Sequence, residues 1–258
     1  MGVVAARTLL AVVVMLPFAV RGGGLREVWH RWPELVGLAA LELAVPFTLI
    51  SGGEQRISSS LTAILIATGP FMVAGINALM GVERIRRLAA AGLGLGLVGV
   101  VVLVGVDVGS DTRQLVGIAM IVGAVACYAV AVVWMRRRMS DVSPVGVMTV
   151  MCMAAAAMTT PFALGQLPDG VPSASVVWSL VGLGLGCTAL ALVIYMALIA
   201  ELGGVRAMLV TYLNPVVAVV AGVLVLGESF TWAMLSGMAL IGLGSWLATR
   251  PAGHTAAT

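Results

Sequence analysis

The chain of 258 residues contains no lysine, only two histidines and few charged residues, which together make up 10% of the sequence. Because a soluble domain carries about 25% charged residues, this chain has too little polar surface to face water on all sides. Apolar residues make up 61% of the chain, and the mean hydropathy is +1.12. These values predict an integral membrane protein, and the net charge of +3 gives no reason to expect a nucleic-acid partner.

Cysteine and histidine are too few and too scattered to suggest a chemical centre. Cys127, Cys152 and Cys187 all lie in apolar runs, and an odd number of such cysteines favours small core residues over a disulfide framework. His30 and His254 lie outside the apolar runs and far apart. No phosphate-binding or dinucleotide-binding motif stands between a strand and a helix. We therefore expect no enzyme, no catalytic residue, no cofactor and no metal site.

Apolar runs long enough to cross roughly 30 Å of hydrocarbon as helices recur throughout the chain. The runs disfavour the strands of a membrane barrel, because they are about twice as long as the 9–11 residues of a barrel strand and do not alternate in polarity. The sequence thus predicts an all-α integral membrane bundle with about nine spans, near residues 3–20, 33–53, 58–80, 87–106, 114–135, 144–165, 175–199, 205–226 and 231–249.

A single ungapped offset of 145 residues relates the two halves of the chain. It places Pro70 on Pro215, Glu83 on Glu228, Gly92 on Gly237, Gly99 on Gly244, and residues 35–38 on residues 180–183. Matches that need no gap indicate an internal duplication. The predicted domains are a first repeat at 1–106, an external connection at 107–113, a second repeat at 114–249 and a cytoplasmic tail at 250–258.

The arginines predict the orientation. Counted over alternate loops and the C-terminal tail, eleven arginines fall on one side of the membrane and two on the other. Because positively charged loops face the cytoplasm, we expect the arginine-rich loops and the C-terminus there, in a multi-pass protein of the cell membrane. The two exceptions, Arg56 and Arg113, are expected outside.

The two copies are unequal in length. Shifting the helix at 114–135 back by 145 residues places it before Met1, so the first repeat lacks one helix of an expected five plus five. We expect a sequence that begins about 30 residues late, through a shortened chain, a misassigned start codon or a genuine deletion. The alternative is a secretory signal at 1–20, which has the required apolar length but no A-x-A site before Arg21.

An odd number of helices in each repeat places the two repeats in opposite orientations. Glu83 then lies in a cytoplasmic elbow and Glu228 in an external one, where each is expected to brace the start of the next helix. Pro70 and Pro215 are expected to interrupt helix hydrogen bonding, and Gly92 and Gly237 to allow close helix packing. Inverted repeats around a central site are the usual architecture of secondary transporters.

A family resemblance is carried by Pro215…Gly227-Glu228…Gly237…Gly244, its copy Pro70…Glu83…Gly92…Gly99, and the helix from Ala126-Cys127-Tyr128 to Arg136-Arg137-Arg138. These residues resemble the drug/metabolite transporter superfamily, EamA type, over essentially the whole chain. The resemblance implies ten helices in two inverted repeats and transport of small metabolites, amino acids or drugs, mostly as export. The chain departs from that pattern by its missing first helix. A transporter working by alternating access is therefore the interpretation, and a non-transporting subunit or sensor on the same fold is the alternative.

Two charged residues within predicted helices are the main candidates for binding a small substrate. Glu42 lies about 13 Å deep and Arg7 about 6–8 Å deep at 1.5 Å of rise per residue. A charge at such depth usually faces a cavity or a partner. The two side chains form a structural ion pair, or Glu42 binds a proton or a cationic group while Arg7 binds a carboxylate; the sequence leaves both alternatives open. The remaining polar candidates are Asn77, Thr188, Tyr195, Tyr212 and Asn214.

Overall fold

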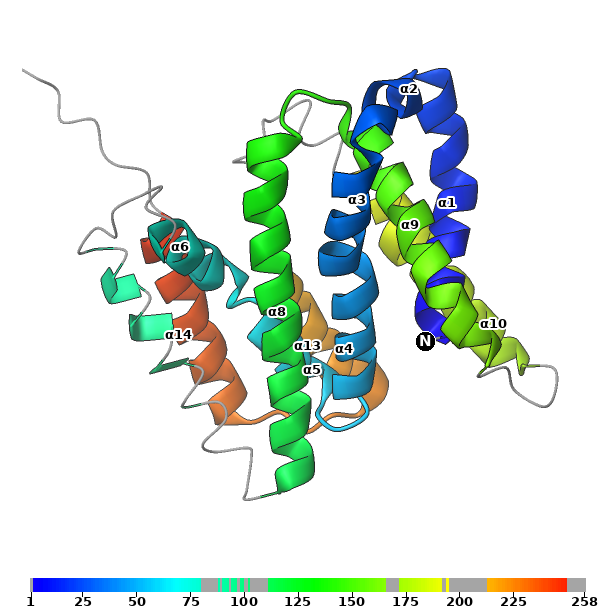
Figure 1. Cartoon of the computed structure of the whole chain (residues 1–258). Coiled ribbons are helices and arrows are strands. Elements are labelled where there is room, and N and C mark those ends of the chain that lie inside the picture. The colour runs from blue at the N-terminus through cyan, green and yellow to red at the C-terminus, as the bar shows by residue number, and fades with distance from the viewer. Residues whose placement is uncertain are drawn as a thin grey trace, which may run out of the picture. The chain divides into compact units, whose positions relative to one another are not determined.

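The structure is a computed structural model that describes residues 2–79, 88, 90–92, 94–96, 98–99, 102, 111–165, 172–191, 194 and 213–249. Within these residues the regular structure is helical throughout, and no strand occurs (Figure 1). Five described helices are long and apolar enough to cross a membrane: Gly2–Arg21, Gly24–Gly53, Ser59–Leu79, Thr112–Arg138 and Pro144–Leu164. The predicted all-α membrane bundle is confirmed.

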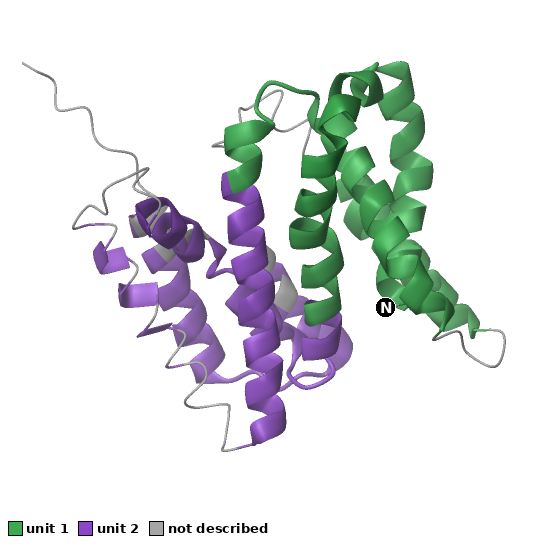
Figure 2. Cartoon of the chain, in the orientation of Figure 1, with its two compact units in different colours: residues 1–49, 134–209 green, residues 50–133, 210–258 purple. Residues whose placement is uncertain are grey.

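The chain forms two compact units, and each unit contains part of each repeat (Figure 2). Unit 1 comprises residues 1–49 and 134–209, and unit 2 comprises residues 50–133 and 210–258. Residues 1–49 of the first repeat pack with residues 134–209 of the second in unit 1, and the last helices of both repeats pack together in unit 2 with most of α8 (Thr112–Arg138), the first helix of the second repeat. The packing units differ from the sequence repeats because helices of one repeat bury their apolar faces against helices of the other, as α1 (Gly2–Arg21) does against α9 (Pro144–Leu164) and α5 (Ser59–Ile66) does against α13 (Leu213–Leu226).

Unit 1 is organised around α1 (Gly2–Arg21) and α9 (Pro144–Leu164), which pack against each other. Helix α9 also packs against α2 (Gly24–Val28), α3 (Trp32–Ala39) and the π-helical turn η2 (Ala40–Ala44), while α1 packs against α10 (Ala174–Val181) and the π-helical η3 (Gly182–Leu190). The 3₁₀ turn η1 (Trp29–Arg31) joins α2 to α3, and α4 (Val45–Gly53) continues the same rod. Fully buried side chains of Met15, Leu35, Leu38 and Met151 fill this unit.

Unit 2 contains α5 (Ser59–Ile66), α6 (Gly69–Leu79), most of α8 (Thr112–Arg138), α13 (Leu213–Leu226) and α14 (Trp232–Thr249). Its core is a cluster of buried side chains from Ile57, Leu61, Ile64, Leu65, Phe71, Ile121, Val125, Val219, Met234 and Ile241. The predicted span at 58–80 is broken at Ala67 and Thr68, so Pro70 lies in the first turn of α6, where it removes no helical hydrogen bond.

Glycines of the two repeats meet in unit 2 in a reciprocal way. A Cβ atom added to Gly99 would lie 3.1 Å from the carbonyl oxygen of Gly237, and one added to Gly244 would lie 2.6 Å from that of Gly92. Since the offset places Gly92 on Gly237 and Gly99 on Gly244, the two contacts exchange under a two-fold operation. The contacts also run in opposite directions along α14 and along the helical residues described at 90–92, 94–96 and 98–99. These helices are therefore antiparallel, as inverted repeats require.

The π-helical turns occupy equivalent positions in the two repeats. Shifting η3 back by 145 residues places it on residues 37–45, a stretch that contains η2. A π-helical turn is rare and is frequent at functional sites. Its appearance at the same place in both copies indicates that this local irregularity belonged to the duplicated unit.

A network of hydrogen bonds joins η1 to the turn between α8 and α9. The guanidinium of Arg31 donates to both carboxylate oxygens of Asp141, at 2.8 and 2.6 Å, and to the carbonyl oxygen of Arg138. The hydrogen bond from Arg31 is the largest of the interactions that lower the pKa of Asp141 below its ordinary value of 3.8. A carboxylate whose pKa is lowered in the folded protein stabilises the fold at pH values above its ordinary pKa. This stabilisation is lost as the pH falls through the pKa of the carboxylate in the folded protein.

Asp141→Asn is therefore expected to lower the thermal unfolding temperature at pH 7, and this difference from the wild type should shrink below pH 3.8. Thermal unfolding of both proteins in detergent at several pH values measures it. Glu27→Gln, at an exposed carboxylate on α2, is the control and should change the temperature little at any pH. An Asp141→Asn difference that is equal at neutral and acidic pH would contradict the role of the ion pair.

Candidate functional site

Arg7 is held inside unit 1 between two helical segments that are distant in sequence. Its Nε and Nη2 atoms donate to Oγ1 of Thr188 in η3 at 3.3 and 3.0 Å. Its guanidinium carbon lies 3.7 Å from the centroid of the Phe47 ring on α4, a cation–π contact. Thr188 donates in turn to the carbonyl oxygen of Leu183 at 2.8 Å. These contacts orient the guanidinium within the apolar part of the unit.

Glu42 is placed by η2 on the same rod as Phe47. Its Oε2 atom is buried, and no described residue donates a hydrogen bond to it. Leu38 and Leu43, its neighbours along the rod, are buried as well. A buried carboxylate without a donor is costly unless a proton, a cation or a new donor compensates its charge. The Oε2 atom of Glu34 is buried without a donor too, but Glu34 lies in the first turn of α3, where the helix dipole favours its charge. Glu42 lies further along the same rod, away from that helix start, and is therefore the better candidate for binding a transient partner.

Glu42 and Arg7 do not form an ion pair with each other. Among the described residues the ion pair within 4.0 Å is that of Arg31 and Asp141. The sequence left open whether Glu42 and Arg7 pair with each other or each bind a substrate group. The ion pair between them is not formed in the structure. The acidic and the basic side chain lie in one compact unit, and each faces a different set of neighbours.

Not all of the other predicted site residues lie beside Arg7 and Glu42. Thr188 contacts Arg7 directly. Asn77 lies on α6, in unit 2. Asn214 and Pro215 lie on α13, and Tyr195, Tyr212 and Glu83 lie outside the described residues. The site predicted for these residues remains a prediction.

Two neighbours of Arg7 were not predicted from the sequence. Phe47 is an apolar residue in an apolar run and carries no signal of its own. Cys152 on α9 is fully buried, and the charge of Arg7 acts on its thiol. Cys152 could have been found from the internal repeat, because the offset of 145 residues places Arg7 on Cys152. By the same offset Glu42 corresponds to Cys187, so both charges belong to the first repeat alone.

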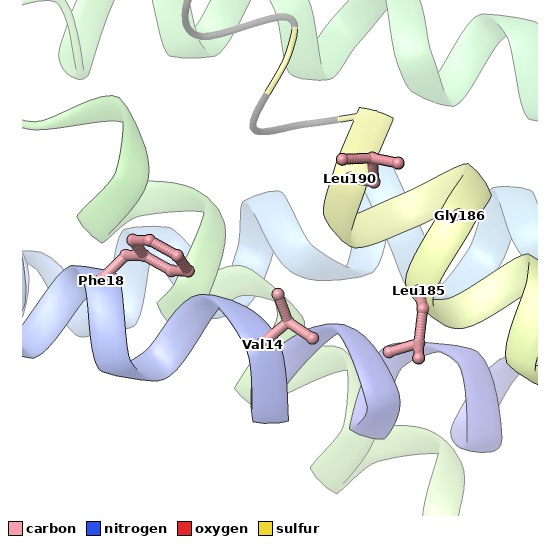
Figure 3. Close-up of a pocket in the computed structure, with 5 residues that line it drawn as sticks. All are labelled: Val14, Phe18, Leu185, Gly186 and Leu190. Atoms are coloured by element: carbon pink, nitrogen blue, oxygen red, sulfur yellow. The ribbon is translucent and has the colours of Figure 1, made fainter.

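An open apolar groove lies between α1 and η3, and neither Arg7 nor Glu42 lines it. Its volume is about 360 Å³, and it is lined by Val14, Phe18, Leu185, Gly186 and Leu190 (Figure 3). The side chains from α1 and from η3 point toward one another across it in Figure 3. A Cβ atom on Gly184 would lie 3.2 Å from the carbonyl oxygen of Arg7, so glycine allows α1 and η3 to approach closely beside Arg7.

Glu228 has a structural role in unit 2, but at a different helix from the one expected. Its carboxylate accepts hydrogen bonds from the backbone nitrogens of Ser59 and Ser60, at 2.8 and 3.1 Å, and from the Ser60 hydroxyl. It thus braces the start of α5, where the helix dipole favours a negative charge. The start of α14, the next helix along the chain, is capped instead by Oγ1 of Thr231. The elbow itself turns at Gly227, whose φ of 68° suits glycine.

Glu228→Gln is expected to destabilise the fold by about 1–3 kcal/mol, because the amide nitrogen cannot accept a hydrogen bond and leaves a donor of α5 without its partner. Thermal or denaturant unfolding in detergent measures the loss. Glu27→Gln, which changes the same chemistry at an exposed position, is the matched control. Equal stabilities of the two variants would show that Glu228 does not hold the start of α5.

The described residues contain no group of three or more histidine, cysteine, aspartate or glutamate side chains that could hold a metal ion. Unit 1 contains Glu42, with its buried Oε2 atom, and Arg7, which Thr188 and Phe47 hold in place. A charged side chain at membrane depth usually faces a partner or a cavity, so both side chains suit reversible binding of a small polar molecule or ion.

Comparisons with known proteins agree with this description. The model of the EamA-like transporter family matches residues 1–105 and again residues 115–250. The chain is 24% identical to an "uncharacterized transporter" of Archaeoglobus fulgidus, over 95% of this chain and 85% of that protein. It is 25% identical to a "probable amino-acid metabolite efflux pump" of Salmonella typhimurium, over 87% and 83% of the two chains. It is also 26% identical to the inner membrane transporter YedA of Escherichia coli, over 93% and 81%.

A crystal structure of a protein with 22% sequence identity superposes with a TM-score of 0.68, over 96% of this chain and 86% of that one, which shows the same fold. The family model covers both halves of the chain, and the helices that the structure describes have the length and composition of membrane spans. The chain therefore belongs to the EamA-like transporter family and is a multi-pass membrane transporter.

Proposed function

We propose that the protein exports a small metabolite by alternating access and that Glu42 and Arg7 form part of its binding site. The observation that carries the proposal is the buried Oε2 atom of Glu42, which has no hydrogen-bond donor among the described residues. In a transporter, a buried charged side chain of the binding site can be neutralised by the substrate while the substrate is bound. Glu42 would accept a proton or a cationic group, and Arg7 would bind an anionic one.

A substrate that carries an amino group and a carboxylate satisfies both side chains. The planar guanidinium fork of Arg7 suits a carboxylate, and Thr188 and Phe47 hold that fork in place. The relative from Salmonella typhimurium is named for efflux of amino-acid metabolites. We infer that this chain transports zwitterionic metabolites of the same chemical class, with a proton on Glu42 as the coupling ion.

The repeated π-helical turns support a mechanism in which the site opens to each side in turn. Glu42 lies in η2, and Thr188, which binds Arg7, lies in η3. A π-helical turn contains poorly aligned backbone hydrogen bonds and is a place where a helix bends easily. Bending at η2 and at η3 would therefore change the surroundings of Glu42 and of Arg7 together.

Contacts within each unit support the proposed orientation. Arg31 binds the turn between α8 and α9 in unit 1, and both of these segments are predicted to be cytoplasmic. In unit 2, Arg113 donates to the carbonyl oxygen of Gln55 at 3.3 Å, and both are predicted to be external. Loops assigned to one side by their arginines thus contact one another. The same assignment places the C-terminus in the cytoplasm.

Counterflow in liposomes tests the proposal. Purified protein is reconstituted with unlabelled amino acids inside, and uptake of each labelled amino acid is followed against empty liposomes. We expect at least one zwitterionic substrate to exchange, and Arg7→Gln to weaken its exchange more than Arg7→Lys, because lysine keeps the positive charge. Absence of counterflow for all zwitterionic substrates, with correctly folded protein, would favour the alternative of a non-transporting subunit or sensor.

A further inference from the structure

Five exposed arginines gather at one end of unit 1. Arg21 ends α1, Arg26 lies on α2, and the last turn of α8 carries the other three, Arg136, Arg137 and Arg138. Figure 2 shows α2 and the C-terminal ends of α1 and α8 within unit 1, at the same end of that unit. We call these five residues the arginine surface.

The contacts of neighbouring residues hold this surface together. Arg31 binds the carbonyl oxygen of Arg138 and both oxygens of Asp141, which ties the rod of α2 and α3 to the end of α8. Gly24 and Gly146 are in close contact, since a Cβ atom on Gly24 would lie 3.3 Å from the Gly146 backbone. The arginines therefore belong to a defined surface rather than to separate loops.

None of the five guanidiniums has a hydrogen bond or an ion pair in the part of the chain that the structure describes. The nearby carboxylate of Asp141 is taken up by Arg31, which leaves Glu27 as the exposed acidic side chain on α2. By contrast, Arg56 and Arg113 in unit 2 both donate to backbone carbonyl oxygens. The arginine surface thus has an excess of unpaired positive charge.

Two exposed tryptophans lie beside the arginine surface. Trp29 in η1 is 61% exposed, and Trp32 at the start of α3 is 54% exposed. Exposed tryptophan next to arginine at the end of membrane helices is typical of the layer where lipid headgroups lie. The two indole rings would anchor this end of the unit at the depth of the lipid phosphates.

We propose that the arginine surface binds the headgroups of anionic phospholipids. A guanidinium donates two parallel hydrogen bonds to a phosphate, which a lysine ammonium does not. Each basic residue near an anionic membrane surface contributes about 1 kcal/mol to the attraction. Five unpaired arginines and two interfacial tryptophans would therefore enrich anionic lipids around unit 1 relative to zwitterionic lipids.

Quenching of tryptophan fluorescence by brominated lipids tests the proposal. The protein is reconstituted in vesicles of phosphatidylcholine and phosphatidylglycerol in which one or the other lipid carries brominated acyl chains. The difference between wild type and a Trp29→Phe/Trp32→Phe variant isolates the signal of the two tryptophans. We expect brominated phosphatidylglycerol to quench this signal at least about twofold more than brominated phosphatidylcholine at equal mole fraction.

Substitutions at positions 136–138 separate charge from geometry. Replacement of Arg136, Arg137 and Arg138 by lysine keeps the charge that orients the chain, and should weaken the preference for phosphatidylglycerol. Replacement by glutamine removes three of the five charges and should weaken the preference further, leaving the part that Arg21 and Arg26 contribute. Inorganic phosphate should weaken the preference no more than chloride at equal ionic strength, since the ligand is a lipid. Equal quenching by both lipids in the wild type, or an undiminished preference in the glutamine variant, would overturn the proposal.

Discussion

Glu42→Gln is expected to lower the rate of substrate counterflow by about 10- to 100-fold. Glutamine cannot carry a negative charge or take up a proton at this place. Loss of a hydrogen bond to a charged group costs about 1.5–3 kcal/mol, and each 1.4 kcal/mol is a factor of ten in binding. Counterflow in proteoliposomes at several pH values measures both the loss and any change in pH dependence.

Glu34→Gln is a matched control for this experiment. Glu34 lies on the same rod, in the first turn of α3, and its Oε2 atom is also buried without a hydrogen-bond donor among the described residues. We expect it to keep counterflow within about twofold of the wild type, because a carboxylate at a helix start is favoured by the helix dipole and needs no substrate. If Glu42→Gln transports as well as Glu34→Gln, with an unchanged pH profile, Glu42 is not a site residue.

Gly244→Ala is expected to destabilise the protein by about 1–3 kcal/mol, the usual cost of inserting a methyl group into a packed interface. The new Cβ atom would lie 2.6 Å from the carbonyl oxygen of Gly92 and 2.7 Å from the backbone nitrogen of Gly96, and backbone atoms cannot rotate away. In a chain of this size, 1 kcal/mol corresponds to a change of about 2–4 °C in Tm. Thermal unfolding in detergent measures it.

Gly242→Ala is the control, since a Cβ atom there meets no atom within 4 Å and the residue lies on the same helix. The reciprocal contact provides a second test. Gly99→Ala brings a Cβ atom to 3.1 Å from the carbonyl oxygen of Gly237, so it should destabilise the protein as well. If the Gly242→Ala and Gly244→Ala variants unfold at the same temperature, the antiparallel contact between the equivalent helices is contradicted.

The fold could be predicted from the sequence to a large extent, because the features that determine it are local or repeated. Composition predicts the membrane bundle, and the offset of 145 residues predicts the inverted copies that the Gly92–Gly244 and Gly99–Gly237 contacts reveal. The compact units could not be predicted. They depend on which apolar faces pack together, and nearly every face in this chain is apolar.

The site was predicted less completely. Counting residues along a helix gives the depth of Arg7 and Glu42 but not the direction in which each side chain points, so the two appeared able to pair. In the structure Arg7 turns to Thr188 and Phe47 instead. A π-helical turn changes the direction in which the following side chains of a helix point, and η2 and η3 contain Glu42 and Thr188. Such a turn leaves no recognisable pattern in an apolar sequence. The partner of Glu228, 168 residues away, likewise depends on packing.

The central claim is that two copies of one unit lie in opposite orientations across the membrane. Single cysteines at Gly22 and at Leu167, which the offset of 145 places on each other, test it most directly. In a background with Cys127, Cys152 and Cys187 replaced by serine, each is treated with an impermeant thiol reagent on intact cells and after permeabilisation. We predict that Leu167→Cys reacts in intact cells and that Gly22→Cys reacts only after permeabilisation. Reaction of both from the same side would contradict the inverted duplication and, with it, the proposed mechanism.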